Sequence, residues 1–350
     1  MRPALRFALP VLLACLPAAV SAAPPVAATV ETTLKTAAGQ IRQLAFDGDP
    51  DTYFASAQDA GAADHFTLVF DQPVAVQAIT VTTGRPQGGD RLDDGALDIS
   101  ADGRTFAPAA RFAEGVAHAK LQGQRVRAVR VRPTADLKHP LAIRELTIMS
   151  EPAVAVFKYP VEFVVDASDA PDLKAWAEKA AQVCTRAYPM INEELKSDGF
   201  KPRRVITLAL KADYRGVAAT GGGHITASAR YFRAHPDDVG ALVHETVHVV
   251  QDYRGRGPGW LVEGMADYIR FFKFEPGKLG RIDPDRARYN GSYRVTASFL
   301  AYVTVKYDRE LVRKLNALLR AGKYQDQAFK DLTGKTLAEL NEDWRASLRR

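Results

Sequence analysis

Residues 241–251 read Ala241-Leu-Val-His244-Glu245-Thr-Val-His248-Val-Val-Gln251, and this stretch decides how the second half of the chain is interpreted. An α-helix turns once per 3.6 residues, so His244 and His248 lie one turn apart on the same face. Two neutral imidazoles at this spacing can bind one Zn²⁺, and Glu245 beside them can accept a proton from metal-bound water. The apolar neighbours predict a helix buried on most faces, where ionisable groups are costly unless something binds them. We therefore predict a zinc site; a chance match in a core helix is the alternative.

A second stretch, residues 260–268, supplies the rest of the predicted site. Gly255, Gly257 and Pro258 end the first helix, and a second helix is expected to begin near Trp260. Glu263 on this helix is the predicted third ligand, which leaves a fourth position open for water, as in catalytic zinc sites. Asp267 lies one turn further on and can hydrogen-bond the free ring nitrogen of a ligand histidine. A surface carboxylate is the alternative interpretation of Asp267.

The pattern is similar to the gluzincin group of zinc peptidases, in which the third ligand is a glutamate. Five separated blocks narrow the resemblance to the basic secretory protein family, secreted proteins of plants and bacteria regarded as metallopeptidases. The blocks are 223–231, 235–240, 244–251, 260–270 and 291–300. The resemblance covers roughly residue 161 to the C-terminus. It implies an α+β zincin-like metallopeptidase domain at residues 158–350, and the helical periodicity beyond residue 280 predicts that its second half is helical.

The expected reaction is hydrolysis of a protein or peptide substrate. Zn²⁺ in the predicted site would acidify its bound water and polarise the scissile carbonyl. Glu245 is the predicted general base, which later passes the proton to the leaving amine. The developing oxyanion needs a donor besides the metal, for which Tyr293 is the first candidate and His224 the second. Packing is the alternative role of each.

The residues just before the metal helix predict a place for the substrate. Residues 225–232 read as a strand, and in zinc peptidases of this general plan an edge strand beside the metal helix pairs with the extended substrate. We expect residues 225–232 to be that edge, with an ordinary inner strand as the alternative. Asp237 or Asp238 is expected to cap the metal helix.

Residues 40–150 predict a separate domain made of β-strands. Short apolar runs recur between turns such as Asp47-Gly48 and Asp102-Gly103, which favours an antiparallel sandwich. The expected strands cover residues 65–70, 76–82, 96–100, 126–132 and 143–149. The sequence thus predicts a multidomain protein, with an N-terminal all-β jelly-roll sandwich before the α+β domain.

Three stretches of this region, 45–54, 97–106 and 143–148, resemble the discoidin, or coagulation-factor 5/8 type C, family of jelly-roll modules. The resemblance implies a module that binds carbohydrate or a cell surface and holds a structural Ca²⁺. On that analogy Asp47, Thr52 and Glu145 are candidate oxygen ligands, and Asp47 capping a turn is the alternative. Sugar-binding members usually present tryptophan on their loops, whereas the three tryptophans of this chain all lie outside the region.

The first 22 residues predict a signal peptide. Arg2 and Arg6 precede an apolar run at residues 7–20, and cleavage is expected between Ala22 and Ala23. Lipidation at Cys15 is a less favoured alternative, because the residues after it stay apolar. The mature protein is therefore expected to be secreted or periplasmic.

Charge and cysteine content restrict the remaining possibilities. Lys and Arg number 47 against 41 Asp and Glu, and no basic run carries interleaved aromatics, so nucleic-acid binding is not expected. Cleavage leaves Cys184 alone, which excludes an internal disulfide. We expect a monomer. Two other functions remain open: a cell-surface or glycan-binding protein with a vestigial zincin domain, and a zinc hydrolase that is not a peptidase.

Overall fold

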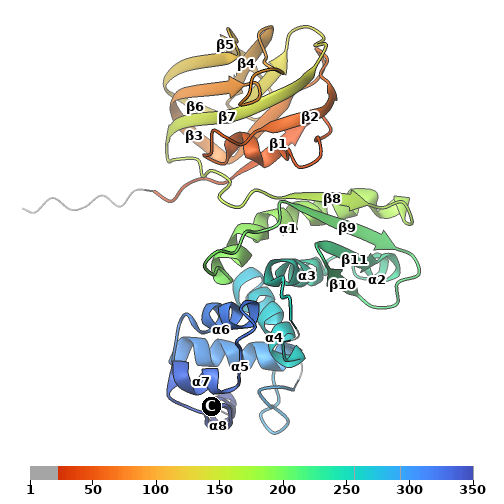
Figure 1. The fold of residues 1–350 in the computed structure, drawn as a ribbon, viewed down its shortest axis with the longest axis vertical. Coiled ribbons are helices and arrows are strands. Elements are labelled where there is room, and N and C mark those ends of the chain that lie inside the picture. The colour runs from red at the N-terminus through yellow and green to blue at the C-terminus, as the bar shows by residue number, and fades with distance from the viewer. Residues whose placement is uncertain (1–22, 256, 292, 350) are drawn as a thin grey trace, which may run out of the picture.

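The computed structural model describes residues 23–255, 257–291 and 293–349. The β-sandwich lies at one end, a small sheet with the helices beside it lies in the middle, and a group of helices forms the other end (Figure 1). The described residues form two hydrophobic cores, one with residues from Val26 to Val154 and the other with residues from Val161 to Trp344. The predicted signal peptide, with Cys15, falls outside the described residues. None of the described helices is long and apolar enough to span a bilayer.

The N-terminal domain is the predicted all-β sandwich, and two 18-residue strands run through both of its layers. The first half of β3 pairs with β1 and with the last part of β6, which also pairs with β4. After a register shift, the second half of β3 pairs with β7 and with the first part of β6. Strands that change layer at such irregularities close a sandwich around its core. The strands are β1 (Ala28–Thr32), β2 (Phe54–Asp59), β3 (Phe66–Thr83), β4 (Gly95–Ser100), β5 (Ala107–Arg111), β6 (Val116–Pro133) and β7 (Pro140–Glu151).

The second domain begins with a four-stranded sheet in the order β10-β11-β9-β8, covered on one face by α1 and α3. Strands β8, β9 and β11 are parallel, and β10 is antiparallel to β11. The elements are β8 (Glu162–Asp166), α1 (Lys174–Glu194), β9 (Val205–Lys211), β10 (Ala218–Gly221), β11 (His224–Ser228), α2 (Ala229–Ala234) and α3 (Gly240–Gln251).

Two expectations about this sheet are wrong. The predicted strand 225–232 ends at Ser228, whose hydroxyl accepts a hydrogen bond from the Tyr231 amide and so starts helix α2. β11 is also an inner strand, because the short strand β10 folds back onto it and forms the edge. Gly222 and Gly223 make this fold-back possible, since both have a positive φ (56° and 84°), as a two-residue hairpin turn requires.

The remainder of the domain is helical, as predicted. Helix α4 (Gly259–Ile269) continues into a π-helical turn at Arg270–Phe274. The other helices are α5 (Tyr293–Lys306), α6 (Leu311–Arg320), α7 (Gln327–Thr333) and α8 (Leu337–Leu348).

The predicted cap of the metal helix is also wrong. Helix α3 begins at Gly240 after Val239, and among the described residues no side-chain hydrogen bond caps it. Asp238 instead forms an ion pair with Arg270 and accepts a hydrogen bond from the Tyr231 hydroxyl at 2.7 Å. The Asp238 carboxylate therefore pairs with an arginine 32 positions away instead of capping helix α3, as the local sequence had predicted.

Candidate metal centre

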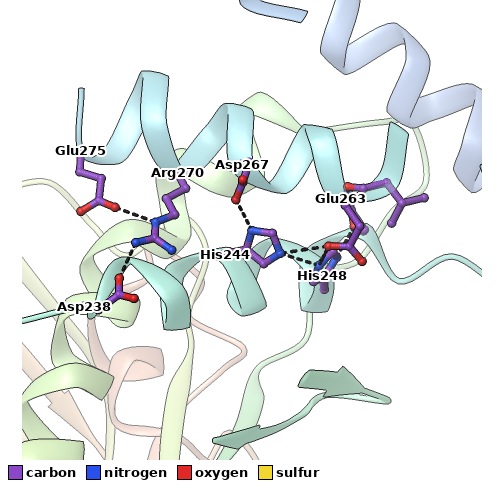
Figure 2. A network of polar contacts seen from close by, with 9 residues as sticks. Asp238, His244, His248, Glu263, Asp267, Arg270 and Glu275 are labelled. Atoms are coloured by element: carbon purple, nitrogen blue, oxygen red, sulfur yellow. Dashed lines mark hydrogen bonds and ion pairs between the residues drawn. The ribbon is translucent and has the colours of Figure 1, made fainter. Parts of the chain in front are cut away.

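Helices α3 and α4 bring three ligand atoms together. His244 Nε2 and His248 Nε2 each lie 3.1 Å from Glu263 Oε2 and 3.0 Å from one another (Figure 2). Two atoms bound tetrahedrally to zinc at about 2.1 Å would lie about 3.4 Å apart. In the described part of the chain this is the one group of three or more His, Cys, Asp or Glu side chains with ligand atoms this close. The donor set and its spacing fit a zinc ion.

The electrostatics of the cluster favour a cation. Burial lowers the pKa of His244, but its hydrogen bonds to Asp267 and Glu263 outweigh this and raise the pKa to about 9. Burial raises the pKa of Glu263, but hydrogen bonds to both histidines lower it to about 2. The acidic groups around the two rings thus stabilise positive charge. A metal ion would replace a proton there, so its binding should release protons.

Each imidazole ring is also hydrogen-bonded at Nδ1, the nitrogen that does not face the cluster. Nδ1 of His244 lies 2.7 Å from Asp267 Oδ1, as its position one turn after Glu263 predicts. Nδ1 of His248 lies 2.7 Å from Gln251 Oε1, and the amide of Gln251 donates to the Val262 carbonyl at 3.0 Å. These contacts direct each Nε2 toward the cluster. Gln251 was not predicted, although its place three residues after His248 on one helix face could have indicated it.

Glu245 lies beside the cluster and is almost fully buried, with 8% of its surface exposed. The Thr220 hydroxyl of strand β10 lies 2.7 Å from its Oε2. Thr220 was not predicted from the sequence. Its strand has only four residues, Ala-Ala-Thr-Gly, which carry no strong apolar pattern.

The structure separates the two candidate oxyanion donors. Tyr293 borders the site, with its ring 6.1 Å from the ring of His244, and the negative charge of Glu263 followed by burial raises its pKa. His224 does not reach the site. It precedes Ile225, which is buried on the side of the sheet that α3 covers. Successive side chains of a strand point to opposite faces, so His224 lies on the other face.

Asp47, Thr52 and Glu145 come close together in the N-terminal domain. The Thr52 hydroxyl lies 2.9 Å from both carboxylate oxygens of Asp47, and the Asp49 amide donates to Asp47 Oδ1 at 3.1 Å. Asp47 therefore also stabilises its turn. Burial, followed by the charge of Asp47, raises the pKa of Glu145 to about 7. Glu145 Oε2 is buried without a hydrogen-bond partner among the described residues. This oxygen set suits a hard cation such as Ca²⁺.

Comparison with solved structures returns small carbohydrate-binding modules that match the N-terminal domain. CBM32-1 of a family 31 glycoside hydrolase from Clostridium perfringens is 17% identical, covers 35% of this chain and 92% of its own, and has a TM-score of 0.31. A Streptococcus pneumoniae fucose binding module is 11% identical over 35% of this chain and 91% of its own, with a TM-score of 0.31. A C. perfringens CBM32 domain in complex with GalNAc-β-1,3-galactose is 16% identical over 35% of this chain and 94% of its own, with a TM-score of 0.30.

Among curated proteins no match to the chain is found. A family model does match: the one described as peptidase of plants and bacteria covers residues 162–344, more than half of the chain. This span begins at strand β8 and includes both helices of the candidate metal centre. The chain therefore belongs to the BSP family, the peptidases of plants and bacteria.

Proposed function

We propose that this protein is an exported zinc-dependent peptidase. The convergence of His244 Nε2, His248 Nε2 and Glu263 Oε2 to within 3.1 Å, next to the carboxylate of Glu245, carries the proposal. Membership of a peptidase family gives the class of reaction. Export is a prediction from residues 1–22.

The chain's own residues have separate tasks in this mechanism. A zinc ion bound by the three ligands would act as a Lewis acid toward water and the scissile carbonyl. Glu245 accepts the proton of the attacking water and returns it to the leaving amine. The Tyr293 hydroxyl donates to the oxygen on which negative charge develops. Asp267 and Gln251 hold the histidine rings in the tautomer that keeps Nε2 free.

The edge strand β10 offers a place for the substrate backbone. It pairs with β11 on one side, and no described strand pairs with its other side. It lies beside α3, which carries His244 and Glu245. An extended peptide added to such an edge is held by main-chain hydrogen bonds. We assign to β10 the role that was expected of residues 225–232.

Zinc analysis combined with proteolysis tests the proposal. The purified chain should contain one zinc ion and should digest casein, and a chelator should abolish digestion until zinc is restored. A chain with zinc that hydrolyses esters or acetyl-lysine but leaves casein and a peptide library intact would be a different zinc hydrolase. A chain without zinc affinity would instead support a binding protein with a vestigial zincin domain.

Removal of the carboxylate behind His244 should weaken zinc binding. Asp267→Leu is expected to lower zinc affinity by about 10- to 100-fold, because the ring loses the acceptor that fixes its tautomer. Asp267→Asn should lose much less, since an amide oxygen still accepts, as that of Gln251 does for His248. Titration against a competing chelator measures both. Equal affinities in the wild type and the leucine variant would show that Asp267 does not support the metal.

We also propose that Asp47, Thr52 and Glu145 hold a structural Ca²⁺, and pH dependence tests this. A carboxyl group with a raised pKa in the folded state stabilises the fold below its usual pKa of 4.5, and this contribution is lost as pH rises through about 7. Without calcium, the unfolding temperature of the sandwich should therefore fall over this range. Millimolar calcium binds the ionised form, so it should stabilise more at about pH 8 than at about pH 5.

Calorimetry of the full chain follows the unfolding transition of the sandwich. Glu145→Gln cannot ionise and should remove most of the difference between the two pH values. The site would be contradicted if calcium stabilised Glu145→Gln as much as the wild type at about pH 8. It would also be contradicted if calcium stabilised the wild type equally at both pH values. The carbohydrate or cell-surface ligand of the sandwich stays a prediction from the resemblance, which a glycan array probed with the full chain would test.

A further inference from the structure

We propose that Thr220 is the residue that positions the general base: its hydroxyl holds one oxygen of Glu245 so that the other oxygen faces the reacting water. Thr220 belongs to neither of the helices that carry the motif; it lies on the edge strand β10. The inference rests on the proposed function for the role of Glu245, whereas the contact between the two residues can be tested by itself.

The contact has the geometry of a strong hydrogen bond. Thr220 Oγ1 lies 2.7 Å from Glu245 Oε2 and 2.9 Å from the Glu245 carbonyl oxygen. A hydroxyl has one proton, and a carboxylate is a stronger acceptor than a carbonyl, so the hydroxyl donates to Oε2. Among the described residues, Thr220 is the one hydrogen-bond partner of the Glu245 carboxylate. Oε1 therefore stays available for the proton of the water.

Burial makes this single partner important. Glu245 is 8% exposed, and its neighbours Val243 and Val247 on α3 are fully buried. A buried carboxylate that loses its donor is left with an uncompensated desolvation cost, and it can also rotate away from its place. A small misplacement of a reacting group lowers a rate strongly.

The strand pairing explains why Thr220 points at the base. Thr220 pairs with Ile225, which is fully buried against the helix side of the sheet. Directly opposed residues of a strand pair share a face, so Thr220 also faces the helix. A shift of the register by one residue would turn its hydroxyl to the opposite face. The turn at Gly222 and Gly223 holds this register.

One strand therefore has two roles. Its backbone edge is the proposed docking site for the substrate, and its Thr220 side chain holds the base. Because the side chain points to α3 rather than to the substrate, losing the hydroxyl should lower kcat while KM changes little. A residue with only a role in substrate binding would change KM instead.

Three variants test the catalytic role. Thr220→Val removes the hydroxyl at nearly constant shape and should lower kcat by about 10- to 100-fold, with KM within about two-fold and zinc content unchanged. Thr220→Ser keeps the hydroxyl and should restore most of the activity. Thr226→Val is the matched control, because Thr226 pairs with Ala219 and so lies on the opposite face of the sheet. Wild-type kcat in Thr220→Val would overturn the proposal.

A measurement that needs no activity tests the contact. Thr220→Val should lower the unfolding temperature of the metal-free protein, but should cause little further change in a Glu245→Leu background, where no carboxylate remains to be satisfied. Equal losses in both backgrounds would show that Thr220 does not hold Glu245. If wild-type protein cleaves no peptide, the proposed function and the catalytic role of Thr220 both fail. The comparison of Thr220→Val in the two backgrounds still decides whether the contact with Glu245 exists.

Discussion

Glu245→Gln is expected to lower the rate of peptide hydrolysis by about 10²- to 10⁴-fold while zinc stays bound. Glutamine has the size of glutamate but cannot take a proton at neutral pH, so the attacking water loses its base. The amide oxygen can still accept the hydrogen bond of Thr220, so the fold of the site should persist. The three predicted ligands are unchanged, and zinc content should therefore equal that of the wild type.

Peptide-library digestion and metal analysis on the same preparation check this result. Glu178→Gln is a matched control, because Glu178 is exposed on α1 and should keep full activity. Full activity in Glu245→Gln would show that another group is the base. Loss of zinc from this variant would instead mean that Glu245 supports the metal, and the rate could then say nothing about proton transfer.

Tyr293→Phe is expected to lower kcat by about 10²- to 10³-fold, with a much smaller change in KM. The ring of Tyr293 lies 6.1 Å from that of His244, and the charge of Glu263 together with burial raises the pKa of the phenol above its usual 10.0. The hydroxyl therefore keeps its proton at neutral pH and remains a donor. A donor that acts only on the developing oxyanion stabilises the transition state and leaves substrate binding nearly unchanged.

Steady-state kinetics on one chromogenic peptide separate the two parameters. Tyr268→Phe is the matched control, since Tyr268 is a buried residue of α4 that stacks on Phe272. It should keep kcat within about two-fold. If Tyr293→Phe keeps the wild-type kcat, Tyr293 does not stabilise the oxyanion. A change in KM alone would assign it to substrate binding.

Local helical spacing determined most of what the sequence could say about the site. His244 and His248 are four residues apart on one helix, and Glu263 and Asp267 are four residues apart on the next. Side chains at this spacing share a face whatever the rest of the fold does. The strand patterns in residues 40–150 were informative for a similar reason, because alternation in a strand is also local. The family resemblance added the order of the motifs along the chain.

Pairing between strands decided the features of the site that the sequence could not predict. Residues 225–232 look like one strand, but the Ser228 side chain starts a helix after the first four of them. The face that His224 occupies follows from the burial of Ile225 under α3, which no local pattern reveals. The edge strand β10 is too short for a pattern, and it exists because two glycines turn the chain back onto β11.

The sequence by itself thus predicted the sandwich, the two motif-bearing helices and the candidate metal ligands, because each prediction follows from residue spacing within single strands or helices. Only the tertiary structure decided which residues support them. Thr220 and Glu245 are 25 positions apart in the chain. Arg270 and Asp238, which pair instead of Asp238 capping α3, are 32 positions apart. Such contacts depend on how separate helices and strands pack against one another, and that packing is set by the whole core rather than by any one stretch of residues.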